Sequence, residues 1–130
     1  MQTRRARTVA IADDSPTFVE AASRYVAALP GYAVAGIAHC ASEAPALVAA
    51  CRPDLLLLDL GAAPSRGVEL LRRVRALPSA PAIVAMTLFH SAGAAQAAME
   101  AGAAGLVGKD AFVSGLTQIL ARLFPTEIAA

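Results

Sequence analysis

The stretch from Pro53 to Asp59, Pro-Asp-Leu-Leu-Leu-Leu-Asp, decides the fold of this chain. Its leucines follow one another directly, so they lack the alternation of a strand that has one face in water. They predict a short strand covered on both faces, as in the middle of a parallel sheet. The strand ends on a carboxylate, at the edge where open α/β sheets bind their ligands. Asp59 is therefore the candidate reactive residue.

Composition limits the kind of protein that this chain can be. Its 130 residues are expected to form one domain over 1–130, with a core from about residue 8 to residue 124. The net charge of +1 gives no field that would attract nucleic acid or an anionic membrane. No apolar run approaches the roughly 20 residues that cross a bilayer, and no targeting signal is recognised. A cytoplasmic protein is expected, and Cys40 and Cys51 fit its reducing environment because they show no pattern.

Strand and helix patterns alternate along the whole chain. Ser15 followed by Pro16 is typical of a helix start, and Ser42 is expected to cap the second helix. The predicted strands are 9–12, 32–37, 55–59, 82–86 and 105–108, and the predicted helices are 16–29, 42–51, 67–77, 92–101 and 112–124. Five strands and five helices in strict alternation predict an α/β fold with a doubly wound parallel sheet.

Polar residues stand at the ends of four of these strands. Asp13 and Asp14 follow the first strand, and Asp59 ends the third. Thr87 ends the fourth strand, and Lys109 follows the fifth. The carboxyl ends of parallel strands share one edge, so these side chains are expected in one crevice. Three carboxylates there would repel one another, so either one pKa rises or a cation lies among them.

The residue types favour a magnesium site and phosphoryl chemistry. Carboxylate oxygens suit a hard ion such as Mg²⁺ better than Zn²⁺, since His39 and His90 lie outside the set. Lys109 and Thr87 then remain as donors for an anion bound beside the metal. A carboxylate nucleophile, a divalent ion, a hydroxyl and an ammonium are the parts needed for phosphoryl transfer to an aspartate.

With these residues in place, the sequence resembles the receiver domains of bacterial two-component response regulators, the CheY-like family. The resemblance covers nearly the whole chain. The motifs that carry it are Asp13-Asp14, the run from Pro53 to Leu60, Gly67-Val68-Glu69-Leu70-Leu71, Thr87, Ala101-Gly102-Ala103 and Lys109. The pair Lys109-Asp110 is similar to the NarL-like subfamily, whose receivers precede a helix-turn-helix domain.

The resemblance implies a role for each acidic residue. Asp59 is similar to the phosphoacceptor, and Asp14 to a direct Mg²⁺ ligand. Asp13 is similar to an acid that acts on the metal through water. Gly61 resembles the residue whose backbone carbonyl also binds the metal.

The resemblance also implies a fold and a partner. The strand order would be the flavodoxin-like 2-1-3-4-5. The phosphoryl group would come from a sensor histidine kinase or a phosphotransfer protein, and Thr87 and Lys109 would contact it. Phosphorylation would then change the surface of the last two helices and the last strand. Such a domain is no enzyme for a separate substrate, since it assists only its own phosphorylation and dephosphorylation.

Several positions depart from the family pattern. Pro64 stands one place later than the usual proline, Leu106 replaces an aromatic residue, and Leu88 follows the hydroxyl where many members have alanine. These departures keep a second hypothesis open, a pseudo-receiver that acts as an interaction module without phosphorylation. Gly61 and Phe89 stand two places after the acceptor and the hydroxyl, where they offer no polar side chain to orient water. The resemblance therefore implies slow loss of the phosphoryl group, with Phe89 as an apolar wall of the site. The alternative is that the small residues Gly61, Ala62 and Ala63 open the site to bulk water.

The final helix carries two apolar stripes. The stripe expected to seal the helix onto the sheet is Phe112, Leu116, Ile119 and Leu123. The adjacent stripe is Val113, Thr117, Leu120 and Phe124. Little charge surrounds this second stripe, so Val113, Leu120 and Phe124 are expected to form a homodimer or effector surface. The alternative is that the second stripe is buried within the monomer.

Overall fold

Strands and helices alternate along the chain in the structure, a computed structural model that describes residues 5–125. The strands are β1 (Arg7–Ala12), β2 (Tyr32–Ala38), β3 (Leu55–Asp59), β4 (Ala82–Thr87) and β5 (Gly105–Gly108). The helices are α1 (Pro16–Ala28), α2 (Ala44–Cys51), α3 (Pro64–Arg75), α4 (Ala92–Glu100) and α5 (Phe112–Leu123). Short 3₁₀ turns at Ala41–Glu43 and Lys109–Ala111 precede α2 and α5. The five parallel strands have the order β2-β1-β3-β4-β5, which confirms the doubly wound, flavodoxin-like fold.

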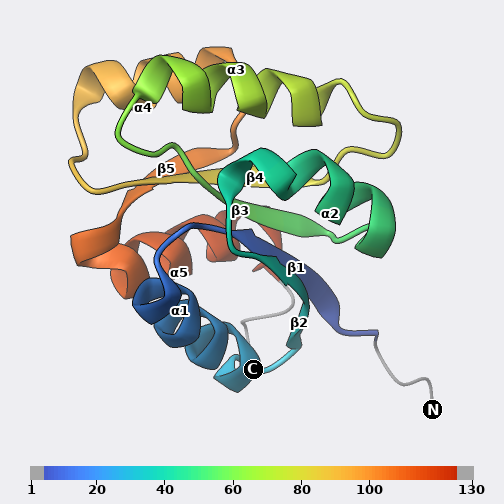
Figure 1. Cartoon of the computed structure of the whole chain (residues 1–130). Helices are drawn as coiled ribbons and strands as arrows, with labels where there is room; N and C mark the ends of the chain where they lie inside the picture. The colour runs from blue at the N-terminus through green and yellow to red at the C-terminus, as the bar shows by residue number, and fades with distance from the viewer. Residues whose placement is uncertain (1–4, 126–130) are drawn as a thin grey trace.

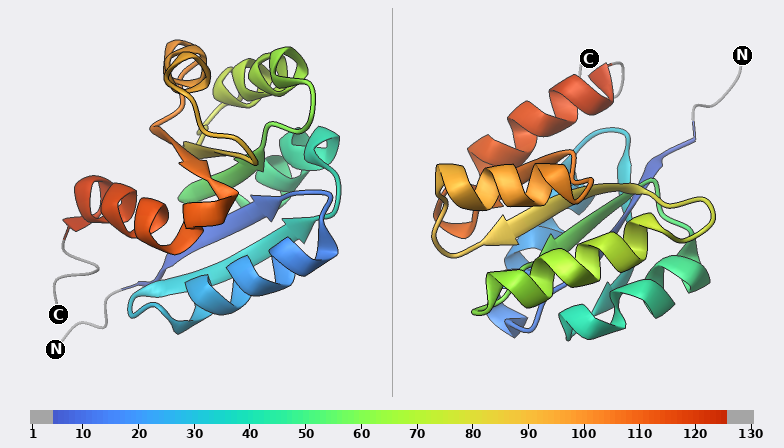
Figure 2. Two further views of the ribbon diagram at one scale, coloured as in Figure 1. Left: turned by 90° about the vertical axis from the view of Figure 1, so that its left-hand side faces the viewer. Right: turned by 90° about the horizontal axis from the view of Figure 1, so that it is seen from above.

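The sheet lies between two layers of helices (Figure 1). Helices α2, α3 and α4 cover one face, and α1 and α5 cover the other, as the turned views of Figure 2 also show. The leucines of β3 divide between the two layers. Leu56 and Leu58 pack in the cluster under α2, α3 and α4, whereas Leu55 and Leu57 pack in the cluster under α1 and α5. All four have an exposed fraction of 0%, so the prediction of a strand buried on both faces is confirmed.

The register of the sheet places the polar residues at one edge. Ala12 of β1 pairs with Leu58 of β3, and Asp59 pairs with Met86 of β4. Thr87 pairs with Gly108 at the end of β5. The residues that follow these pairs therefore leave the sheet side by side. This edge is the carboxyl end of the strands, where α/β folds bind ligands.

The helix starts were predicted with mixed success. Ser15 caps α1 as predicted, since its Oγ accepts a hydrogen bond from Phe18 N at 3.3 Å. The prediction that Ser42 caps α2 is wrong, because Ser42 lies inside the preceding 3₁₀ turn, where its Oγ contacts Cys40 Sγ at 2.9 Å. Helix α3 begins at Pro64, earlier than predicted, because proline is well suited to the first helical position.

The prediction of an exposed second stripe on α5 is wrong for most of its members. Leu120 is fully buried, and Phe124 packs against Tyr32 with ring centroids 6.4 Å apart. Thr117 contacts the hydroxyl of Tyr25 on α1. Only Val113 is largely exposed, at 54%. The physical reason is that α1 lies beside α5 on the same face of the sheet, where Tyr25 covers Thr117, while Tyr32 of β2 covers Phe124.

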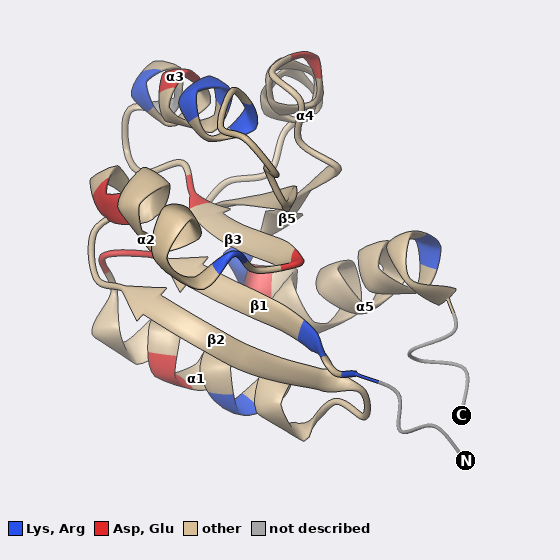
Figure 3. Ribbon diagram, turned by 90° about the vertical axis from the view of Figure 1, so that its right-hand side faces the viewer, with Lys and Arg blue, Asp and Glu red and all other residues tan. Residues whose placement is uncertain are grey.

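Exposed positive charge gathers on α3 (Figure 3). The helix packs on the sheet through Leu70, Leu71 and Val74, and its exposed arginines are Arg66, Arg72, Arg73 and Arg75. The last three stand in the final turn, where a positive charge interacts favourably with the helix dipole. Among residues 5–125, no helix has both the length and the apolarity that a bilayer crossing requires.

Candidate functional site

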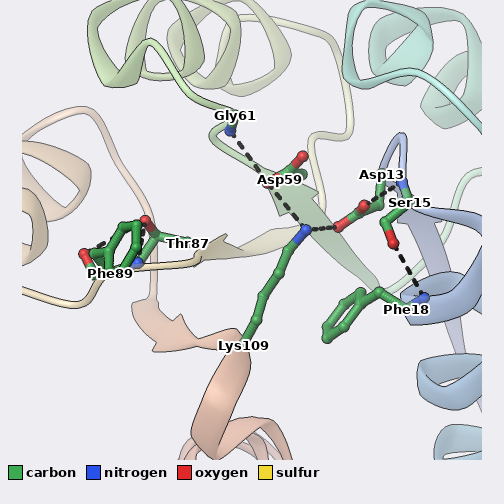
Figure 4. Close-up of polar contacts among 8 residues, drawn as sticks. All are labelled: Asp13, Ser15, Phe18, Asp59, Gly61, Thr87, Phe89 and Lys109. Atoms are coloured by element: carbon green, nitrogen blue, oxygen red, sulfur yellow. Dashed lines mark hydrogen bonds and ion pairs between the residues drawn. The ribbon is translucent and has the colours of Figure 1, made fainter.

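The carboxyl ends of β1, β3 and β5 bring three charged side chains together (Figure 4). Asp13 follows β1 and is fully buried, whereas Asp59 ends β3 and is 5% exposed. Lys109 follows β5, and its side chain is 10% exposed. Lys109 Nζ lies 2.6 Å from Asp13 Oδ2 and 3.4 Å from Asp59 Oδ1. Two buried acids therefore share one ammonium group.

Backbone amides fix the orientation of both buried carboxylates. The amide of Ser15 donates to Asp13 Oδ1 at 2.8 Å, at the start of α1. The amide of Gly61 donates to Asp59 Oδ1 at 3.1 Å. Gly61 has a φ of +75°, a left-handed conformation that costs glycine little. A glycine at this position therefore lets the chain turn back and aim its amide at Asp59.

The Asp59 carboxyl has a raised pKa. Burial is the largest cause, because it disfavours the charged form, and the negative charge of Asp13 raises the pKa further. The hydrogen bond from Gly61 and the charge of Lys109 act in the opposite direction. Burial prevails, so the carboxylate form of Asp59 is less stable here than in water.

A cavity of about 380 Å³ opens beside these groups. Its lining consists of Asp14, Ser15, Phe18, Asp59, Gly61, Ala62, Leu88 and Lys109. A second groove, of about 370 Å³, meets this cavity at Asp14, Asp59 and Gly61. It runs between helix α3 on one side and the 3₁₀ turn Ala41–Glu43 on the other. The reactive carboxyl is therefore accessible to a ligand although little of it is exposed.

The acidic residues fit a hard divalent cation. Asp13, Asp14 and Asp59 each offer a carboxylate oxygen, and these oxygens lie within 4.8 Å of one another. Asp13 Oδ2 is buried and makes no hydrogen bond of good geometry within the described residues, apart from its ion pair with Lys109. The set contains oxygen donors only, which suits Mg²⁺ better than Zn²⁺. His39 and His90 are exposed and lie outside the cluster, as predicted.

Thr87 stands at the predicted edge, but its hydroxyl is turned away from the acids (Figure 4). Its Oγ1 lies 3.4 Å from Phe89 N and 3.5 Å from Phe89 O, as an acceptor of the first and a donor to the second. The side chain of Phe89 is 84% exposed and does not line either cavity, so the expectation that it forms a wall of the site is wrong. Leu88 lines the cavity instead. Leu88, directly after Thr87, therefore shapes the cavity beside Asp59, and Phe89 does not.

The sequence interpretation missed one residue of this site, Phe18 on α1. Its ring centroid lies 4.7 Å from Lys109 Nζ. In the sequence, Phe18 is only one of the apolar residues at helical spacing in α1. Its contact with Lys109 depends on how α1 packs beside the end of β5. No spacing rule along the chain gives that information.

Asp59→Asn should stabilise the fold at neutral pH. Between the ordinary Asp pKa of 3.8 and the raised pKa of Asp59, the folded protein retains a proton that the unfolded chain has lost. The free energy of unfolding of the wild type therefore falls as the pH rises through this window, and the asparagine variant lacks that fall. Denaturant titrations in EDTA from about pH 3.5 to 7.5 measure the difference. Parallel pH profiles for the two proteins would contradict the raised pKa.

Comparison with known proteins places the chain in a family. The response regulator receiver domain model matches residues 9–121. A protein-glutamate methylesterase/protein-glutamine glutaminase of Agrobacterium fabrum is 38% identical over 104 residues, which are 79% of this chain. The chain spans only 30% of the length of that relative.

Solved structures agree with this result. A LuxR-family two-component response regulator from Aurantimonas sp. SI85-9A1 is 30% identical, with a TM-score of 0.76 over 95% of this chain and 96% of that one. The signal receiver domain of NarL from Mycobacterium tuberculosis has the same fold, with a TM-score of 0.79 at 24% identity over 98% of this chain and 100% of that one. The match to the family model, the fold and the acidic pocket agree: this chain belongs to the response regulator receiver domain family.

Proposed function

We propose that this chain is a phosphoacceptor switch in which Asp59 receives a phosphoryl group. The observation that carries the proposal is the surroundings of Asp59: a buried carboxyl at a cavity, 3.4 Å from the ammonium of Lys109 and clustered with Asp13 and Asp14. The donor is the phosphohistidine of a sensor histidine kinase or a phosphotransfer protein. Such donors act in the cytoplasm, which we propose as the location of this chain.

In the proposed reaction, a carboxylate oxygen of Asp59 attacks phosphorus. Within the described residues, the hydrogen bond and the ion pair of Asp59 both fall on Oδ1, so we assign the attack to Oδ2. The new bond joins Oδ2 to phosphorus, and the bond from phosphorus to the donor nitrogen breaks. The donor leaves with the electron pair of that bond, and an aspartyl phosphate remains. Gly61 N and Lys109 Nζ hold the carboxyl group in one orientation during the attack.

Charge stabilisation comes from the residues around the carboxyl. Lys109 is placed to neutralise a phosphoryl oxygen next to Asp59. Asp13, Asp14 and Asp59, with the backbone carbonyl of Gly61, would hold Mg²⁺, which when bound supplies further positive charge for the phosphoryl oxygens. Phosphoryl transfer depends mainly on such placement and charge, so this set suffices without a separate general base.

We propose that Thr87 links phosphorylation to the surface. To donate a hydrogen bond to the phosphoryl group, its hydroxyl must leave the backbone of Phe89, to which it is bound in this structure. Breaking the hydrogen bonds between Thr87 and Phe89 frees the loop between β4 and α4. The movement of this loop then changes the surface formed by α4, β5 and α5. Leu106 on β5 is buried and not aromatic, so the change would proceed through the loop without rotation of a ring.

The role proposed is regulatory, for one receiver unit over residues 1–130. The proposal includes no methylesterase activity, because the chain spans only 30% of the length of the Agrobacterium fabrum relative. The alternative is a pseudo-receiver that binds partners without phosphorylation. The outward orientation of Thr87 and the presence of Leu88 in the cavity lining favour that alternative.

The test of the proposed function is the intact mass after incubation with acetyl phosphate and Mg²⁺. The wild type should gain one phosphoryl group, and EDTA should prevent the gain. Asp59→Asn should gain none, because an amide is a poor nucleophile. If the wild type remains unmodified while circular dichroism shows that it is folded, the pseudo-receiver alternative replaces the switch.

A further inference from the structure

The ring of Phe18 forms a third contact of the Lys109 ammonium, besides the two acids. Lys109 Nζ lies 4.7 Å from the ring centroid of Phe18, and the lysine side chain is only 10% exposed. An ammonium over an aromatic face is attracted by the negative face of the ring, more strongly where water is excluded. The three groups come from different elements: Asp13 follows β1, Asp59 ends β3 and Phe18 lies on α1.

The Phe18 ring is itself held in place. It meets the ring of Phe112 edge-on, with centroids 5.2 Å apart and planes at 80°. Phe112 is buried and makes a second edge contact with Tyr25 at 5.8 Å. The backbone of Phe18 is fixed by the capping hydrogen bond that its N–H donates to Ser15 Oγ. The ring face is therefore presented to Lys109 by a packed aromatic group and not by a free side chain.

Phe18 and Lys109 also form a partition between two cavities. Both residues line the cavity beside Asp59, and both line a groove of about 500 Å³ between α1 and the start of α5. The exposed carboxylate of Asp110 lines that groove as well. Without the Phe18 ring, the Lys109 side chain could turn into this groove. Asp110 would then compete with Asp13 and Asp59 for the ammonium group.

We propose that Phe18 is a positioning residue that holds the Lys109 ammonium between Asp13 and Asp59. Its function in the reaction rests on the proposed phosphorylation of Asp59, whereas the contact itself does not. A smaller apolar residue at position 18 still packs on Phe112 but offers no ring face. Lys109 then spends less time beside Asp59, and phosphorylation becomes slower.

The experiment compares Phe18→Leu and Phe18→Tyr, each alone and combined with Lys109→Gln. Acetyl phosphate is the donor, because a small donor needs no docking surface. Phe18→Leu should slow phosphorylation about three- to tenfold, the range expected for a partly buried cation over a ring. Phe18→Tyr keeps the ring and should remain within about twofold of the wild type. In the Lys109→Gln background, Phe18→Leu should have little further effect on the rate.

Phe124→Leu is the matched control. Phe124 also carries a cation over its ring, with Arg7 Cζ at 4.6 Å, and meets a second ring, that of Tyr32. These contacts lie away from the Asp59 cavity, so Phe124→Leu should affect stability without changing the phosphorylation rate.

A denaturant cycle over the same variants separates this inference from the proposed function. Non-additive unfolding free energies for Phe18→Leu and Lys109→Gln support the contact even if no protein is phosphorylated, in which case only the switch fails. Additive effects on both rate and stability would overturn the positioning role. A Phe18→Tyr variant as slow as Phe18→Leu would also overturn it.

Discussion

Lys109→Gln should lower the rate of phosphorylation of Asp59 by about two to three orders of magnitude. The ammonium lies 3.4 Å from Asp59 Oδ1, so it is placed to neutralise an oxygen of a phosphoryl group that is transferred to Asp59. Glutamine keeps a similar length and a hydrogen-bond donor but removes the charge. The rate is measured by intact mass with acetyl phosphate under excess Mg²⁺.

The same substitution should also destabilise the fold. Asp13 is fully buried, and Lys109 is its ion-pair partner at 2.6 Å. Removing one partner of a buried pair costs about 3 to 5 kcal/mol, because the other charge is left uncompensated. The rate must therefore be compared at a temperature where both proteins are folded.

Arg122→Gln is the control for the loss of a positive charge. Arg122 donates a hydrogen bond to Ala104 O, just before β5, and has no ion pair with Asp13 or Asp59. Wild-type rates for Lys109→Gln would contradict the role of the ammonium.

Leu57→Ala should lower the free energy of unfolding by about 3 to 5 kcal/mol. Leu57 has an exposed fraction of 0% in the central strand, where α1 and α5 cover it, so truncation leaves a cavity that the sheet cannot close. Leu88→Ala removes the same atoms from a side chain that is 66% exposed, and its effect should remain within about 0.5 kcal/mol. Denaturant unfolding of the two variants measures both values. Similar losses for Leu57 and Leu88 would contradict the assignment of the core.

The fold was predictable because its main signals are local. The uninterrupted leucines of β3 indicate a strand with two covered faces, and the alternation of elements restricts the topology to a doubly wound sheet. The strand order was predicted only through the family resemblance. Ser42 was misread as a cap because a 3₁₀ turn and a helix start share the same residue preferences. The burial of Leu120 depends on α1 lying beside α5, which no single helix pattern contains.

The positions of the site residues were more predictable than their orientations. Asp13, Asp59 and Lys109 meet because each stands at the carboxyl end of a strand, and parallel strands end at a common edge. The sequence shows that position for each of the three residues. The rotation of Thr87 toward the backbone of Phe89 depends on the shape of one loop. The ring of Phe18 reaches Lys109 only through the packing of α1 on α5. Such contacts between elements carry no signal in the linear sequence.

The most direct test of the central claim is to locate the phosphoryl group on the chain. After incubation with acetyl phosphate and Mg²⁺, borohydride reduces an aspartyl phosphate to homoserine, which peptide mass spectrometry then locates. The proposed function predicts homoserine at Asp59 and at no other aspartate, with unphosphorylated protein as the control. Homoserine at Asp13 or Asp14 with Asp59 unchanged would contradict the assignment of Asp59 as the phosphoacceptor.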